Sequence, residues 1–187
     1  MKIKLDSPFP LIHPNPVVII GTKYNDNVNF TTIGDVAVAG LKPALVMISL
    51  HENYLSTSYI KKTNKFSINI ATKEILPFVD FCGVVSGKNR DKSLEVNYTL
   101  INDLPIIDDS PISLLVCVEH SYKYEQRVIM VCRVLETYVA EELIKMNKFD
   151  LSSINSVVYG LDNKYYTTND IIGEGYFEYK KHKKKCD

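Results

Sequence analysis

Small polar side chains that could hold an anion or a flat ligand are concentrated in three short segments of the chain. In the first segment, Asn29, Thr31 and Thr32 surround Phe30 after an asparagine-rich stretch. Their amide and hydroxyl groups could donate hydrogen bonds to a ligand that Phe30 shields from water. Taken alone, these four residues fit better as a hairpin turn followed by β-branched strand residues.

The second segment joins the end of an apolar strand to the start of a predicted helix. Ser49 and Leu50 end the strand, and Ser56 and Thr57 open the helix. At a helix start, free backbone N–H groups, hydroxyl donors and the positive end of the helix dipole converge, so that an anion is well held there. Capping of the helix by Ser56 and Thr57 is an equally good interpretation of these residues alone.

The third segment, residues 86–92, combines a serine-glycine turn at Ser86 with three cations and one carboxylate. Such a loop can bring Lys92 to a phosphate or to the electron-rich edge of a ring system, while Asp91 holds the loop in place. Without the other two segments, an exposed loop with ordinary surface charge is the simpler interpretation.

The sequence contains no motif for direct nucleophilic, acid–base or metal chemistry. The four histidines form neither HxxxH nor HExxH, and the GxSxG, GxGxxG and GxxxxGK[ST] patterns are absent. The four cysteines make no CxxC pair and have no metal-ligand spacing. We therefore predict no catalytic side chain and no metal site, and an enzyme of this sequence would take its chemistry from a cofactor.

Composition argues against several classes of partner. The 187 residues carry 22 basic and 22 acidic side chains, so the chain has no large field to attract nucleic acid or anionic lipid. No stretch approaches the roughly 18 apolar residues of a membrane span, and the first residues lack a signal-peptide core. We expect a cytoplasmic protein that binds neither nucleic acid nor membranes, with a disordered basic end at residues 180–187.

The elements that must position the three segments are mostly short β-strands closed by turn residues. The apolar run 45–50 predicts a strand buried on both faces, whereas the alternation in 66–70 predicts one buried and one polar face. Strands are predicted at residues 17–22, 31–38, 45–50, 66–70, 112–120, 127–139, 156–159 and 165–167, with 112–139 forming a hairpin.

Helices are predicted to be few and short. One covers residues 56–62 and starts at the cap-competent Ser56 and Thr57. A second covers residues 75–82, with Pro77 in its first turn, and residues 141–146 are expected to add one or two helical turns. The sequence thus predicts one mainly β domain spanning residues 1–187.

A series of motifs along nearly the whole chain has the order and spacing of one protein family. The most specific is the run DFCGVVSG from Asp80 to Gly87, followed by Asp91-Lys92-Ser93. The others are residues 14–22, 29–32, 42–50, 57–60, 64–70, 136–139, 154–159, 165–166 and 172–173. Together these motifs resemble the flavin reductase-like, FMN-binding split-barrel proteins, and within them the flavoredoxin branch.

The resemblance implies a fold and a set of roles for the three segments. The fold would be an antiparallel, Greek-key-like split β-barrel with a few short helices. Residues 29–32 would line the isoalloxazine ring and the ribityl chain of FMN, and Ser49 and Leu50 would face the polar edge of the ring. Ser56 and Thr57 would hold the phosphate, and Ser86 and Lys92 would close the pocket over the flavin. Members are homodimers with FMN near the interface, so a second chain would complete each site.

The implied activity is that of an oxidoreductase that takes electrons from NADH or NADPH and passes them to free flavin, a redox partner protein or another small acceptor. This sequence departs from the family at two places. It has His51 and Glu52 where relatives often carry Arg or Lys, and Gln126 and Arg127 where many have a Gly-x-His that has been linked to nicotinamide handling. The second departure favours an alternative, a flavoredoxin-type electron carrier with little turnover of NAD(P)H.

Two further alternatives remain from the sequence. One is a split-barrel module for haem or pyridoxal phosphate, with His51 and His120 as imagined ligands of haem. The other is a redox role for Cys82, although a small packed side chain is the simpler interpretation of that residue.

Overall fold

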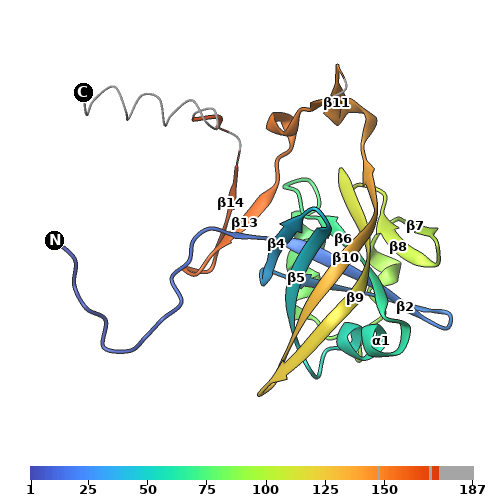
Figure 1. Ribbon diagram of the computed structural model, residues 1–187, viewed down its shortest axis with the longest axis horizontal. Helices are drawn as coiled ribbons and strands as arrows, with labels where there is room; N and C mark the ends of the chain where they lie inside the picture. The colour runs from blue at the N-terminus through green and yellow to red at the C-terminus, as the bar shows by residue number, and fades with distance from the viewer. Residues whose placement is uncertain (147, 169, 173–187) are drawn as a thin grey trace.

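The computed structural model describes residues 1–146, 148–168 and 170–172, and its architecture is mainly β, as predicted (Figure 1). Seven antiparallel strands form one sheet in the order β3-β2-β6-β9-β10-β5-β4. The end strands β3 and β4 do not pair with each other, so the barrel stays split. The strands of this sheet are β2 Val18–Tyr24, β3 Asn27–Ile33, β4 Val36–Leu41, β5 Ala44–His51, β6 Lys65–Ile70, β9 Ile112–Tyr124 and β10 Arg127–Val139.

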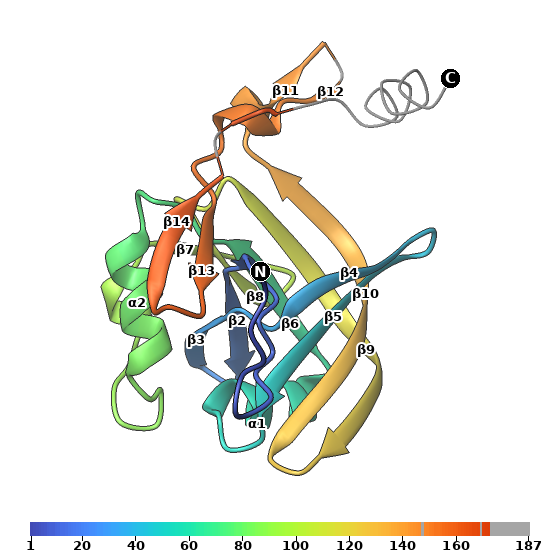
Figure 2. The ribbon, with the colours of Figure 1, turned by 90° about the vertical axis from the view of Figure 1, so that its left-hand side faces the viewer.

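The remaining elements surround this sheet. In Figure 2, α2 and the hairpin β13–β14 lie on one side of the molecule, and β4, β5, β9 and β10 lie on the other. The helices are α1 Leu55–Thr63 and α2 Leu76–Val84, with 3₁₀ turns at Ser93–Glu95, Glu141–Leu143 and Leu151–Ser153. The short strands are β1 Asn15–Pro16, β7 Tyr98–Ile101, β8 Leu104–Ile107, β11 Ile144–Lys145, β12 Lys148–Phe149, β13 Val157–Gly160 and β14 Lys164–Thr167.

Two hydrophobic clusters cover the two faces of β2. Val18 and Ile20 point into the barrel core, whereas Ile19 packs into a second cluster with Phe78 of α2. The strand buried on both faces is therefore β2. The prediction that residues 45–50 are buried on both faces was wrong: burial alternates along β5, and Met47 is 41% exposed. This strand lies next to the sheet edge, with no described helix over its outer face.

The prediction of one polar face for residues 66–70 also needs correction, because that face is buried too. Ser67 and Asn69 of β6 are both fully buried. The Asn69 side-chain oxygen accepts hydrogen bonds from the Ile107 backbone N–H at 3.0 Å and from the Ser113 hydroxyl at 2.8 Å. The hairpin β7–β8 covers these side chains, and their hydrogen bonds satisfy the polar groups that burial removes from water.

Most predicted elements are confirmed, with shifts at their ends. The hairpin at 112–139 is present as β9 and β10, and α2 has Pro77 in its first turn. Helix α1 is followed by the cap residue Asn64, whose φ of 61° is left-handed. The predicted strand 31–38 is divided between β3 and β4, and the helical turns at 141–146 are a 3₁₀ turn followed by β11.

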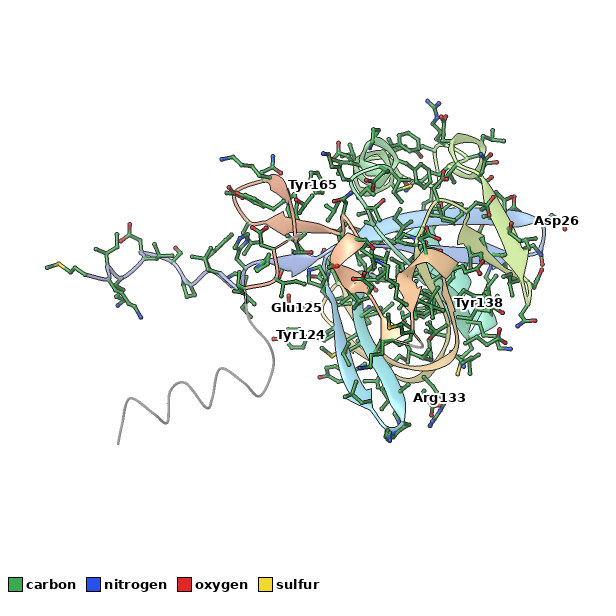
Figure 3. All side chains as sticks on the ribbon, turned by 90° about the horizontal axis from the view of Figure 1, so that it is seen from above. Asp26, Tyr124, Glu125, Arg133, Tyr138 and Tyr165 are labelled. Atoms are coloured by element: carbon green, nitrogen blue, oxygen red, sulfur yellow. The ribbon has the colours of Figure 1, made fainter. Side chains whose placement is uncertain are left out.

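The hairpins project to different sides of the molecule. Figure 3 shows Asp26, at the tip of β2–β3, on the opposite side from Tyr165 of β14. Tyr124 and Glu125 mark the tip of β9–β10. The basic residues 180–187, for which disorder was predicted, lie outside the described residues.

Candidate functional site

The four residues of the first segment divide between two environments, because successive side chains of a strand point to opposite faces. Asn29 and Thr31 point toward α1, where both are buried. Phe30 points the other way and is fully buried in the cluster under α2, with its ring centroid 5.8 Å from that of Phe78. Thr32 also faces α2 and donates to the Val79 carbonyl at 2.6 Å. The Phe30 side chain is therefore a core residue and cannot shield a ligand in the way the sequence suggested.

A buried hydrogen-bond network ties β3 to the first turn of α1. The Ser56 hydroxyl accepts a hydrogen bond from the Asn29 amide at 2.8 Å and lies 2.8 Å from the Thr31 hydroxyl. The Thr22 hydroxyl of β2 donates a hydrogen bond to the Asn29 carbonyl at 3.1 Å and lies 3.3 Å from the Ser56 hydroxyl. The network holds the start of α1 in place against the sheet. Sequence reasoning did not include Thr22, because a single threonine in a predicted strand gives no signal.

Helix α1 begins one residue earlier than predicted, and this changes the roles of its hydroxyl groups. The cap residue is Tyr54, which makes no side-chain capping hydrogen bond, so Ser56 and Thr57 lie inside the first turn. Thr57 donates to the His51 carbonyl at 2.8 Å. Of the two interpretations that the sequence left open for Ser56 and Thr57, capping of the helix is therefore wrong. The first backbone N–H groups of a helix have no partner within the helix, so those of α1 are placed where they could bind an anion.

Lys92 is the most unusual charged residue near this helix start. Its side chain is only 2% exposed, and the ammonium group donates to the Cys82 carbonyl at 2.9 Å. Among the described residues, no carboxylate lies within ion-pair distance of it. Burial lowers the pKa of Lys92, because the charged form is desolvated. A buried cation without a counter-charge is costly, and an anionic ligand would relieve that cost.

Gly87 lets the loop 86–92 approach the helix start closely. A Cβ atom added at Gly87 would collide with the Asn29 side chain, 2.8 Å from its Cγ, and would lie 3.2 Å from Leu55 Cδ2. A Cβ atom added at Gly83, a few residues earlier, would make only an ordinary van der Waals contact, with Thr32 Cβ at 3.8 Å. The glycine at position 87 is therefore needed for packing.

The loop, β3 and the helix start enclose a cavity of about 130 Å³. It brings together Thr31, Ser86 and Lys92 from the predicted site, with Asn29 and Ser56 hydrogen-bonded behind Thr31. The other residues that line it are Tyr54, Leu55, Cys82, Gly83, Val84, Val85 and Gly87. The helix N–H groups, a hydroxyl-lined wall and a buried ammonium group form a donor set that suits a phosphate.

Ser49 and Leu50 do not line this cavity. Leu50 is fully buried in the barrel core. The Ser49 hydroxyl and carbonyl accept hydrogen bonds from Arg127 at 3.1 and 3.2 Å, and Arg127 also pairs with Asp35. Arg127 departs from the family pattern, but no local signal could show that it contacts Ser49, because 78 positions separate them.

A second cavity, of about 260 Å³, shares Gly83 and Val84 with the first. Thr32 lines it, together with Asp80 and Tyr165. The Tyr165 hydroxyl donates to Asp80 at 2.9 Å, and burial together with this bond raises the pKa of Tyr165 to about 12. Two adjoining cavities thus meet at the end of α2, one with a cation and one with a carboxylate.

Cys82 and the histidines do not form a reactive centre here. Burial raises the pKa of the Cys82 thiol to about 12, so it stays protonated as a small packed side chain. His51 is held by Gln126 at 3.0 Å, and neither His51 nor His120 lines the two cavities. Within the described part of the chain, no three His, Cys, Asp or Glu side chains are grouped to hold a metal ion.

Comparison with known proteins places the chain in a family. The model of the flavin reductase like domain matches residues 11–158, so the chain belongs to the flavin reductase-like family, as the motifs indicated. No curated protein matches the sequence significantly. Neither described helix could cross a membrane, because each has nine residues and a span needs about 20.

Solved structures share the split-barrel fold at low sequence identity. Flavoredoxin from Methanosarcina acetivorans is 22% identical, with a TM-score of 0.89 over 97% of this chain and 99% of that one. Flavoredoxin of Desulfovibrio vulgaris (Miyazaki F) is 19% identical, with a TM-score of 0.86 over 95% and 98%. The FMN-binding protein from Thermus thermophilus, solved with bound 1-cyclohex-2-enone, is 16% identical, with a TM-score of 0.81 over 93% and 99%. These matches confirm the predicted fold.

Proposed function

We propose that this protein binds FMN with the phosphate between the start of α1 and Lys92, and that it transfers electrons through the bound flavin. The observation that carries the proposal is the buried Lys92 ammonium group, which has a carbonyl partner but no carboxylate among the described residues. Because it lines the same cavity as Tyr54 and Leu55 at the helix start, two positive features converge on one small space.

Membership of the flavin reductase-like family supports a flavin as the phosphate-bearing ligand, and a protein of the same fold from Thermus thermophilus is FMN-binding. Bound FMN would supply the redox chemistry by accepting and releasing electrons at its ring. The chain's own residues would bind and orient it. Lys92 and the first turn of α1 would hold the phosphate, and Thr31 and Ser86 would line the path from the phosphate toward the ring.

The predicted ring contacts at Thr32, Ser49 and Leu50 would be of different kinds. Thr32 lines the adjoining cavity with its side chain. Leu50 is fully buried in the barrel core, so it would pack behind the site and not touch the ring. Ser49 is held by Arg127, so a ring edge at Ser49 would lie near that guanidinium group. Asp35 already pairs with this guanidinium group, so Arg127 would orient Ser49 and would not add an unpaired positive charge at the ring.

A homodimer is part of the proposal. The cavity beside Lys92 measures about 130 Å³, whereas pockets for small organic molecules and cofactors such as FMN measure roughly 300–1,000 Å³. A second chain would therefore be needed to enclose FMN. The N-terminal arm extends away from the sheet (Figure 1) and exposes apolar side chains, among them Phe9, Leu11 and Ile12 at 56%, 62% and 76%. Exposed apolar groups of this kind are suited to a protein interface.

The electron donor would be NADH or NADPH, and the acceptor would be free flavin, a partner protein or another small molecule. The second candidate is a flavoredoxin-type carrier with little NAD(P)H turnover. It is favoured by Gln126 and Arg127, which stand at the position where many relatives have Gly-x-His. Gln126 forms a hydrogen bond with His51, and Arg127 forms hydrogen bonds with Ser49 and Asp35. A cytoplasmic location stays a prediction.

One optical experiment tests binding and turnover separately. The purified protein is mixed with FMN, desalted, and its absorption spectrum recorded; we expect a yellow protein with one flavin per chain. NADH and NADPH are then added in turn without oxygen. Rapid bleaching by either nicotinamide supports the reductase, and a persistent yellow colour that dithionite removes supports the carrier. A colourless protein that retains no FMN would contradict both, and the same spectra would reveal binding of haem or pyridoxal phosphate.

A further inference from the structure

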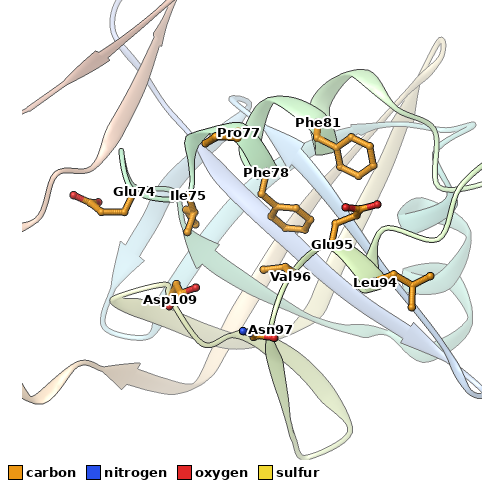
Figure 4. A pocket seen from close by; sticks show the side chains of 10 residues that line it. All are labelled: Glu74, Ile75, Pro77, Phe78, Phe81, Leu94, Glu95, Val96, Asn97 and Asp109. Atoms are coloured by element: carbon orange, nitrogen blue, oxygen red, sulfur yellow. The ribbon is translucent and has the colours of Figure 1, made fainter.

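A cavity of about 680 Å³ opens between α2 and residues 94–97 (Figure 4). It is about five times as large as the cavity beside Lys92, which measures about 130 Å³. None of its lining residues belongs to the predicted flavin site. Its volume lies in the range of roughly 300–1,000 Å³ that is typical of sites for small organic ligands.

Apolar and aromatic side chains form the inner wall of this cavity. Phe78 and Phe81 project from α2, and Figure 4 shows their rings on the side that faces residues 94–97. Ile75 lies at the start of the same helix, and Leu94 and Val96 line the opposite side. A ligand with an apolar body would find contacts on both sides.

The polar side chains of the cavity are mainly acidic. Glu74, Glu95 and Asp109 line it, and no lysine or arginine of the described part of the chain does. The Glu74 carboxylate accepts a hydrogen bond from Asn155 at 2.8 Å, which lowers its pKa and keeps it ionised. Within the described residues, neither Glu74 nor Asp109 forms an ion pair. An apolar wall surrounded by three carboxylates is complementary to an organic cation.

Arg90 shows how a cation fits against this wall. Its guanidinium carbon lies 5.5 Å from the centroid of the Phe81 ring, and its Nη2 donates to Glu95 at 2.5 Å. A cation that meets an aromatic face and a carboxylate at once is held by two different interactions. The Arg90 and Glu95 side chains are 60% and 40% exposed, and exposed pairs of this kind are weak enough for a ligand to replace.

We propose that this cavity binds an organic cation of one or two rings that bears an amidinium, guanidinium or ammonium group. The charged group replaces the Arg90 guanidinium between Phe81 and Glu95, and the apolar body lies along Phe78 and Val96. The proposal does not depend on FMN, because no residue that it uses lines the cavity beside Lys92.

Three molecules of the same shape and different charge test the site: benzamidine, benzamide and benzoate. Binding is followed by two-dimensional NMR of the full chain, with the backbone signals of α2 and residues 94–97 as reporters. We expect benzamidine to shift these signals and to bind at least about threefold more tightly than benzamide, with benzoate weakest, because a cation gains both ring and carboxylate contacts. Equal binding of benzamidine and benzamide, or shifts confined to other parts of the chain, would overturn the proposal.

The decisive variant removes the competing guanidinium. Arg90→Met should tighten benzamidine binding by at least about threefold, because Glu95 and Phe81 become free. Lys88→Met is the matched control, since it removes one positive charge from the same loop without touching the cavity. Equal tightening in both variants would show a general effect of net charge and would refute the proposed exchange.

Two further substitutions in the Arg90→Met background locate the bound cation. Glu95→Gln and Phe81→Leu should each weaken benzamidine binding by about two- to fivefold, because one removes the carboxylate and the other the aromatic face. The melting temperature of each variant is measured alongside, so that a loss of folding is not taken for a loss of binding. Unchanged affinity in folded variants would place the cation elsewhere and contradict the assignment.

Discussion

Lys92 and Arg90 belong to the same loop, yet their environments are opposite. Lys92 is buried, has only a carbonyl partner and faces a small cavity at a helix start. Arg90 is exposed and already holds a carboxylate and an aromatic ring. The contrast teaches that the number of cations in a loop says little about ligand binding. A buried cation without a counter-ion, such as Lys92, is suited to bind an anionic ligand. A cation that is already paired, such as Arg90, occupies a site that could bind another cation.

The contrast between Lys92 and Arg90 is tested most directly by removing each charge in turn. Lys92→Met should weaken FMN binding by about 10- to 100-fold, the equivalent of losing one charged hydrogen bond of roughly 1.5–3 kcal/mol. The matched Arg90→Met should leave FMN affinity within about twofold, because Arg90 already has partners of its own. Quenching of FMN fluorescence in a titration measures both affinities. Equal losses in the two variants would refute the assignment of the phosphate to Lys92.

The two glycines near the flavin cavity give a second comparison. Gly87→Ala should destabilise the protein by about 1–3 kcal/mol, because the added methyl group would collide with Asn29. Gly83→Ala should change stability by less than about 0.5 kcal/mol, since its nearest neighbour would be Thr32 Cβ at 3.8 Å. Urea unfolding of the two variants measures the difference. If Gly87→Ala proved as stable as Gly83→Ala, the close packing of the loop on β3 would be disproved.

A smaller effect is expected from the hydroxyl network that joins β3 to α1. Ser56→Ala should cost about 1 kcal/mol, because the buried Asn29 amide loses its acceptor at 2.8 Å and keeps only Thr31 at 3.3 Å. In Ser58→Ala, the lost hydroxyl bonds only to Leu55 of its own helix, and the change should stay below about 0.5 kcal/mol. Thermal unfolding distinguishes the two, and a larger loss in Ser58→Ala would contradict the role given to Ser56.

The smallest effect concerns pH. Burial lowers the pKa of Lys92 in the folded protein below its ordinary value of 10.5, so between these two values the unfolded chain binds more protons. The contribution of Lys92 to stability should therefore rise with pH in that window and stay constant below it. Urea unfolding of the ligand-free wild type and of Lys92→Met, compared at several alkaline pH values, isolates this contribution. If the unfolding free energy of the wild type relative to Lys92→Met fell as the pH rose, the lowered pKa of Lys92 would be contradicted.

Much of the fold could be predicted, because strands and turns depend on local patterns. The hairpin β9–β10 and the strands β13 and β14 were predicted from apolar runs and turn residues. The predictions were wrong where the burial of a strand face depends on an element far away in the sequence. The alternation in β6 correctly separates Ser67 and Asn69 from the core, but only β7–β8 decides that their face is buried as well. The apolar run of β5 gave no indication that its outer face is uncovered.

For the candidate site, the sequence by itself determined the family and the chemical types: small hydroxyl residues, a glycine-containing loop and a lysine, in a fixed order along the chain. The tertiary structure decided which of them share one space. Thr31, Ser86 and Lys92 line a single cavity, whereas Leu50 lies in the core and Ser49 is held by Arg127. The physical reason is that side-chain direction, burial and the partners of each charge depend on residues tens of positions away. Local sequence can specify a donor, but only the fold determines whether its partner is another side chain or a ligand.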